Sequence, residues 1–423
     1  MQSKFLDNNY FSLNKEIILL FFLYVSLLIS FYYGENSTGG AILDYNNQKI
    51  ITSKFAIQFK DTFFNYDNFS TRHSPLLIIF LSFLERLNFN DEFIRILHVH
   101  LCLFLPFLFY KILKLKFENV DSKILILLTG LIFISPTFRS LSVWPDSRLL
   151  GLTFFSLSIF YFLKFNKNFH FKFAILNILT CALSSYISPN FAVFSLYFFF
   201  NYTKIFKLIS KKTFIIIFIN FIIAAPAIYY VLILDINFLN KSAATNFDKN
   251  DKIFFNNIFN DLIITFSIIF FYLIPFLKEK IIQITKILSF HNIFISIIMS
   301  IICIYFFNYR YEYSGGGIFF KISNYIFDNN LFFYIIGFIS ILVFLPTLLK
   351  NKENLFIFIL ILLNNPQYTI YHKYFDPFLL IIFFSLFNFE ISLKEKKSKH
   401  FIFIYSYFLI FLIIGNLKFL WTT

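Results

Sequence analysis

The sequence predicts an all-α protein, a polytopic bundle of about 13 membrane-spanning helices with juxtamembrane helices in its first outer loop. Two observations favour this class. The 423 residues are 58% hydrophobic and only 14% charged, with a mean hydropathy of +0.71, whereas a soluble domain carries about 25% charged residues. The apolar residues also form long runs separated by short polar connectors, as in a chain that crosses a membrane repeatedly.

The expected spans are apolar runs that approach membrane length. They lie at residues 17–33, 93–110, 123–137, 147–163, 173–188, 190–203, 213–234, 261–277, 287–307, 331–349, 354–370, 376–393 and 401–418. The first run follows Lys4 and Lys15 and has a signal peptide as its alternative reading. Its length, and the lack of a small-residue cleavage site close behind it, favour a span.

The distribution of charge predicts the orientation. The N-terminus and the Lys-rich connectors carry the whole formal excess of +14, and those connectors lie near residues 111–123, 164–172, 204–212, 278–286, 350–352 and 394–399. The positive-inside rule places them in the cytoplasm, with the C-terminus outside. The excess therefore reports topology, and no nucleic-acid partner is expected. Cys102, Cys181 and Cys303 lie far apart in apolar runs and lack metal-ligand spacing.

Residues 74–88 are apolar enough to cross, but a crossing there would turn every later Lys-rich connector outward. We therefore expect a juxtamembrane or re-entrant helix on the outer face. The chain then divides into four parts: 1–33, the cytoplasmic N-terminus and first span; 34–92, an extracytoplasmic catalytic loop; 93–203, an N-terminal transmembrane module; and 204–423, a C-terminal transmembrane module.

Candidate functional residues gather on the expected outer face, where charges near a bilayer are costly and often functional. Asp44 and Asp146 are the candidate catalytic carboxylates and possible ligands of a divalent cation. Asp44 has a solvated loop carboxylate as its alternative, and Asp146 a helix N-terminal carboxylate. The candidate contacts to a phosphate or lipid are Arg72, His73, Arg139, Arg148, His372, Lys373 and Tyr374. For Lys373, snorkelling to lipid headgroups is the alternative.

The order of these features resembles the GT-C superfamily of lipid-phosphate-dependent glycosyltransferases, and most of all the protein O-mannosyltransferases and the aminoarabinose-to-lipid-A transferases. The resemblance covers about residues 15–165. The matching residues are Asp44, His73-Ser74-Pro75-Leu76, Glu92-Phe93-Ile94-Arg95, Ser135-Pro136, Arg139 and Asp146, with a later echo in His372-Lys373-Tyr374-Phe375-Asp376-Pro377. Two positions depart from the family pattern: Tyr45 stands where a Glu is common, and Ser74 where a second Pro is common.

The resemblance implies transfer of a sugar from a polyprenyl-phosphate donor to an acceptor hydroxyl on the extracytoplasmic face, with inversion. Asp44 would take the hydroxyl proton, and the cationic groups would stabilise the departing phosphate. Asp146 would orient Arg139 or the acceptor, or complete a metal site with Asp44. The expected partners are the lipid-linked donor, a glycan, lipid or protein acceptor, and membrane lipid, in a bacterial cytoplasmic membrane.

Other functions fit the same architecture. A flippase or transporter of lipid-linked sugars would show internal repeats, helices broken by Gly or Pro, and midplane charges; this chain has 10 Gly and no evident repeat. A polysaccharide polymerase or ligase usually has a large late outer loop, whereas here the first loop is the long one. A purely structural membrane protein is the remaining alternative.

Overall fold

The computed structural model describes residues 15–69, 71, 73–236, 258–276, 289–310, 315–365, 369–388 and 398–422. All regular structure within these ranges is helical, and they contain no strand. The predicted all-α class is therefore confirmed for the described part of the chain.

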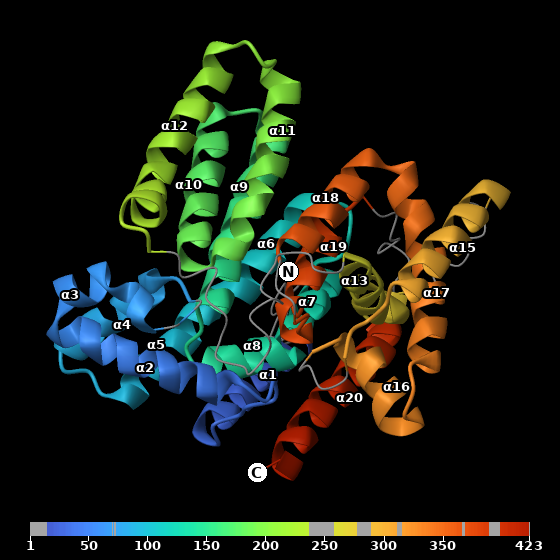
Figure 1. The fold of residues 1–423 in the computed structure, drawn as a ribbon, viewed down its shortest axis with the longest axis horizontal. Coiled ribbons are helices and arrows are strands. Elements are labelled where there is room, and N and C mark those ends of the chain that lie inside the picture. Colours follow the sequence, from blue (N-terminus) through green and yellow to red (C-terminus); the bar gives the residue numbers. More distant parts are fainter. Residues whose placement is uncertain are drawn as a thin grey trace, which may run out of the picture.

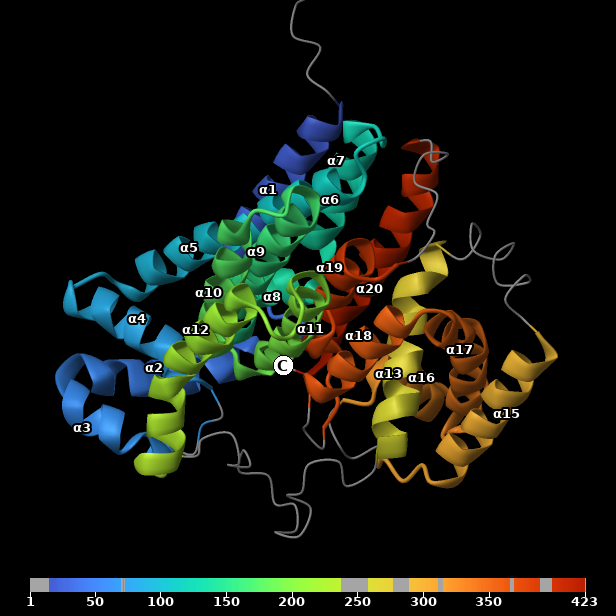
Figure 2. The ribbon, with the colours of Figure 1, turned by 90° about the horizontal axis from the view of Figure 1, so that it is seen from above.

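The first half of the chain forms a helical layer and a group of longer helices beside it (Figure 1). Its elements are α1 (Lys15–Tyr32), α2 (Ala41–Ile57), α3 (Phe59–Phe64), η1 (Tyr66–Phe69), α4 (Pro75–Arg86), α5 (Asp91–Cys102), α6 (Phe104–Lys116), α7 (Ser122–Gly130), η2 (Leu131–Ile134), α8 (Pro136–Val143), α9 (Ser147–Asn168), α10 (Phe171–Ile187), η3 (Pro189–Phe194), α11 (Ser195–Phe206), α12 (Lys211–Ile228) and η4 (Tyr229–Ile233). Helices α9 to α12 stand together, and α2 to α5 lie at one end of this group (Figures 1 and 2).

The second half forms another helical group on the opposite side of α6, α7 and α9 (Figure 2). Its described elements are α13 (Ile258–Leu273), η7 (Ile274–Phe276), α15 (Phe290–Tyr305), α16 (Gly317–Phe327), α17 (Leu331–Lys350), α18 (Lys352–Leu363), η8 (His372–Tyr374), α19 (Phe378–Ser385) and α20 (Ser398–Thr422). One continuous apolar core joins the two groups, with Phe155 of α9 packed against both Phe194 and Phe378.

The segment between the first two predicted spans, residues 34–92, is mostly helical, and Asp44 lies in α2, which differs from the alternative of a loop carboxylate. Pro75 occupies the first turn of α4, where the missing N–H leaves no intrahelical bond unmade. The helix packs along α2 and ends at Arg86, whose Nε and Nη2 donate to the carbonyls of Ala56 and Phe55. These bonds satisfy carbonyls at the end of α2 that would otherwise lack a partner. The helix expected over residues 74–88 is therefore present.

Several described helices are long and apolar enough to cross a membrane, which identifies the architecture of a multi-pass membrane protein. By length and composition there are 7, or up to 8 if α7–η2 and α8, bent by 60°, form one span. They are Lys15–Tyr32, Asp91–Lys116, Ser147–Asn168, Lys211–Ile233, Ile258–Phe276, Leu331–Lys350 and His400–Leu417. This number is smaller than the expected count of about 13.

The difference in the count comes mainly from short helices. Helix α10 has 17 residues and α15 has 16, while α11 and α18 have 12 each and α19 has 8. At 1.5 Å per residue, 12 residues extend only about 18 Å, which is well short of a hydrocarbon core of about 30 Å. Apolar runs in the sequence do not distinguish such short helices from spans.

Candidate functional site

Four segments that lie far apart in the sequence bring charged side chains together. We call Asp44, His73, Asp146, Arg148 and Lys373 the charged cluster. Lys373 Nζ lies 2.8 Å from Asp44 Oδ2, and His73 Nδ1 lies 3.3 Å from Ser147 Oγ, beside Asp146 and Arg148. The charges of Asp44, Asp146, Lys373 and Arg148 all act on the His73 ring.

Asp44 lies in the first turn of α2, where the helix dipole favours a carboxylate. Gly40 lies beside the same lysine, since a Cβ at this position would be in ordinary contact with Lys373 Nζ, at 3.8 Å. Burial lowers the pKa of Lys373, but the attraction of Asp44, Tyr374 and Asp146 outweighs it, so the pKa lies above its usual range. Lys373 is thus a permanent cation that neutralises Asp44.

His73 lies directly before Ser74 and Pro75 at the start of α4. Its carbonyl accepts a hydrogen bond from Tyr66 Oη at 2.8 Å, which holds the turn in place. Burial lowers the pKa of His73 by more than the nearby Asp146 and Asp44 raise it. His73 is therefore a neutral imidazole at neutral pH and offers hydrogen bonds instead of a positive charge.

Asp146 caps α9, as its alternative interpretation predicted, because its Oδ1 accepts the backbone N–H of Arg148 at 2.7 Å. The cap fixes the turn from which Ser147 and Arg148 project. The Arg148 guanidinium lies over the Tyr374 ring, 3.4 Å from its centroid, and Nη1 lies 3.4 Å from Asn365 Oδ1. Element η8 therefore contributes Lys373 to the cluster, and its Tyr374 ring packs against Arg148.

Arg139 serves a different purpose, contrary to the expectation that Asp146 orients it. Its Nε lies 2.8 Å from Glu35 Oε2, and both side chains are only 8% exposed. The remaining guanidinium donors reach Ser26 and Phe133, and also Ser30. Arg139 thus fastens α8 to α1, and its donors are already engaged.

Of the two remaining candidate cations, the structure describes His372 but not Arg72. The His372 ring stacks on Tyr272, whose Oη lies 3.2 Å from His372 Nε2, and it also packs against Phe271 and Phe411. Burial and the charge of Lys321 lower the pKa of His372 to about 3, so this side chain is not the cation that the sequence predicts. Arg72 lies outside the described residues.

The described residues do not fit a metal centre at Asp44 and Asp146. They contain no group of three or more His, Cys, Asp and Glu side chains placed to hold an ion. Asp44 already pairs with the ammonium of Lys373, and Asp146 Oδ1 is used by the helix cap. We therefore derive no step through a divalent cation.

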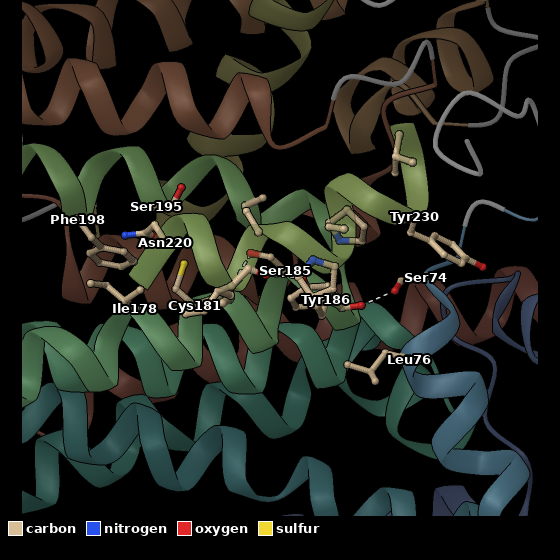
Figure 3. A pocket seen from close by; sticks show the side chains of 18 of the residues that line it. Ser74, Leu76, Ile178, Cys181, Ser185, Tyr186, Ser195, Phe198, Asn220 and Tyr230 are labelled. Carbon is tan, nitrogen blue, oxygen red and sulfur yellow. Dashed lines mark hydrogen bonds between the residues drawn. The ribbon is translucent and has the colours of Figure 1, made fainter. Parts of the chain in front are cut away.

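An apolar groove that sequence reasoning did not find opens beside the cluster (Figure 3). It has a volume of about 490 Å³ and lies between α10, α11 and α12. Ser74 and Pro75 form part of its wall, so one end of the groove adjoins His73. Ser74 Oγ donates to the Tyr186 carbonyl, which ties the start of α4 to the last turn of α10.

Small residues and prolines make room for the groove. Among the lining residues are Ala182, Pro189, Ala192, Ala224 and Pro226. Alanine leaves space between helices, and Pro226 lies within α12 just before η4, where the helical repeat changes. The clustering of these residues in adjacent apolar runs was the available signal, although the sequence alone does not show that they face one another.

Comparison with known proteins adds no relative, since no family model, no curated protein and no solved structure matches the chain. The fold and the site together define the class: a multi-pass membrane protein with a charged cluster at one end of an apolar groove.

Proposed function

We propose that the protein is a membrane glycosyltransferase that moves a sugar from a polyprenyl-phosphate donor to an acceptor hydroxyl, with inversion. The observation that carries the proposal is the position of the charged cluster at one end of the apolar groove, joined through His73 and Ser74. An amphiphile with an apolar chain and an anionic head matches both parts. Transfer on the extracytoplasmic face, with the N-terminus inside, belongs to this proposal.

The donor chain would lie in the groove, with its phosphate beside Lys373, Arg148 and His73. Cationic groups held in a site with little water stabilise the charge that develops on a leaving phosphate. Lys373 now pairs with Asp44 at 2.8 Å, and an incoming phosphate competes for the same ammonium. Donor binding would thereby free the Asp44 carboxylate.

Asp44 would then take the proton from the acceptor hydroxyl as its oxygen attacks the anomeric carbon. The bond between that carbon and the phosphate oxygen breaks, and the electron pair leaves with the lipid phosphate. One new glycosidic bond forms with inverted configuration. Asp146 contributes indirectly, since its helix cap places Ser147 and Arg148.

The test compares two carboxylates. Each lies in the first turn of a helix and pairs with a lysine elsewhere in the structure. Asp44 pairs with Lys373, and Asp91 of α5 pairs with Lys49 at 2.9 Å. In proteoliposomes supplied with polyprenyl-phosphate sugars and candidate acceptors, Asp44→Asn should lower transfer about 100-fold or more. Asp91→Asn should leave transfer near the level of the unaltered protein. Full activity in Asp44→Asn would show that Asp44 is not the general base.

The same proteoliposomes separate the alternatives. A transporter or flippase moves the intact lipid-linked sugar to the other leaflet and forms no new glycosidic bond. A polymerase or ligase forms long or preassembled glycan products, whereas the proposed enzyme transfers one sugar per turnover.

A further inference from the structure

The end of the groove that lies away from Ser74, near Ile178 and Phe198, has buried polar side chains in its lining (Figure 3). Asn177 and Tyr202 line this end, and neither has any exposed surface. Tyr202 Oη donates to Asn177 Oδ1 at 2.8 Å, while Asn177 Nδ2 donates to the carbonyl and the Oγ of Ser158 at 2.9 Å and 2.8 Å. We call Asn177, Tyr202 and Ser158 the groove floor.

Hydrogen bonds and aromatic packing hold the groove floor in place. Hydrogen bonds in apolar surroundings are strong, and breaking them leaves buried polar atoms without partners. The Tyr202 ring is also enclosed by Phe162, Phe165 and Phe206. Helix α12 supports the same end, because its only buried residues are Thr213 and Ile216 near the start of the helix.

The depth of the groove follows from α10. Tyr186 lies near the end occupied by Ser74, whereas Ile178 lies toward the opposite end with Phe198 (Figure 3). From Tyr186 to Asn177 the helix rises about 14 Å. This is about half of a hydrocarbon core of about 30 Å. With the Ser74 end of the groove at the membrane surface and α10 upright, the floor would lie near the middle of the bilayer.

We infer that the groove floor limits the length of lipid chain that the protein contacts. Asn177 and Tyr202 thereby determine chain-length specificity. The inference rests on the proposed function for the identity of the occupant, an isoprenoid chain with a phosphate. Lipid tails are as apolar as a protein groove, so a chain that moves from bilayer to groove gains packing contacts and little transfer energy. Only the segment between the charged cluster and the floor can discriminate between chains.

The inference predicts a length profile. Binding of prenyl phosphates should strengthen from geranyl to farnesyl and geranylgeranyl as the chain fills the groove. It should then change little for undecaprenyl phosphate, because the remaining chain stays in lipid. The probes are these monophosphates, and the readout is equilibrium displacement of radiolabelled farnesyl phosphate from the full-length protein.

Ala182 provides the decisive variant, since it lines the groove between Tyr186 and the floor. Ala182→Phe should shorten the groove, weakening geranylgeranyl phosphate binding about tenfold relative to geranyl phosphate. Leu179→Phe on the same helix is the matched control, because Leu179 is 45% exposed and absent from the groove lining. Ala182→Leu provides a smaller step should the Phe variant fail to fold.

The outcomes are distinguishable. An equal loss for all chain lengths, or no loss, in Ala182→Phe would overturn the inference. If the unaltered protein shows the length profile but no sugar transfer, the proposed function fails and the inference about chain-length specificity stands. If transfer occurs and Ala182→Phe leaves the length profile unchanged, the glycosyltransferase proposal stands and the inference about chain-length specificity is wrong.

Discussion

At the residue scale, the pairing of Asp44 with Lys373 joins positions 329 residues apart. Both side chains are partly exposed, at 34% and 19%, so an anionic ligand can reach the pair. His73 stands beside them as a neutral donor. The cluster thus combines two cations, Lys373 and Arg148, with two carboxylates, Asp44 and Asp146, and the neutral imidazole of His73.

A prediction for pH concerns His372. Its pKa is lowered to about 3 in the folded protein by burial and by Lys321, whereas the unfolded chain titrates near 6.5. Below about pH 6.5 the unfolded state binds the proton and the folded state does not, so stability falls as the pH falls. The free energy of unfolding should drop by about 1.4 kcal/mol per pH unit through this group alone.

The measurement is the apparent Tm between neutral pH and pH 4 for the unaltered protein and for His372→Gln. The variant should lose less Tm on acidification. His170→Gln, at an exposed connector before α10, is the control and should follow the unaltered protein. A steeper acid loss in His372→Gln would contradict the expectation.

At the element scale, the buried pair of Glu35 and Arg139 holds α1 against α8, and Asn416 of α20 reaches Glu35 Oε1 at 3.3 Å. Removing one partner leaves the other charge buried. Arg139→Met should therefore lower stability by about 3–5 kcal/mol. The double change Glu35→Met with Arg139→Met should recover much of that loss, as shown by thermal unfolding in detergent.

An exposed pair serves as the comparison. Lys167 of α9 pairs with Glu118, and both side chains are about half exposed. Solvent screens such pairs, so Lys167→Met should change stability by about 1 kcal/mol or less. Equal losses for Arg139→Met and Lys167→Met would show that Arg139 has no special role in fastening the helices.

At the scale of the whole molecule, the one-sided positive charge predicts the orientation in the membrane. The chain has 3 cysteines, and all of them are buried. A single cysteine introduced at an exposed position is therefore expected to account for the labelling by a membrane-impermeant thiol reagent. Phe80→Cys on α4 should label in intact cells, and Lys207→Cys between α11 and α12 only after permeabilisation. The opposite pattern would invert the topology and place the charged cluster inside.

The sequence by itself determined the class of the protein and selected every member of its charged cluster. Apolar composition requires helices that satisfy their own backbone hydrogen bonds in lipid. In such a chain the few charges stand out, and so Asp44, His73, Asp146, Arg148 and Lys373 could be selected from local signals. The helix at Pro75–Arg86 lies where the apolar run and the distribution of charge predicted a helix that does not cross the membrane.

Only the tertiary structure decided how these residues are used. His372 and Lys373 are neighbours in the chain, yet one stacks on Tyr272 and the other meets Asp44. Arg139 looked like a phosphate contact, but Glu35 occupies it. The groove and its floor depend on which faces of α10, α11 and α12 meet. Packing between distant segments sets these outcomes, and local periodicity carries no information about the partner that a face will contact.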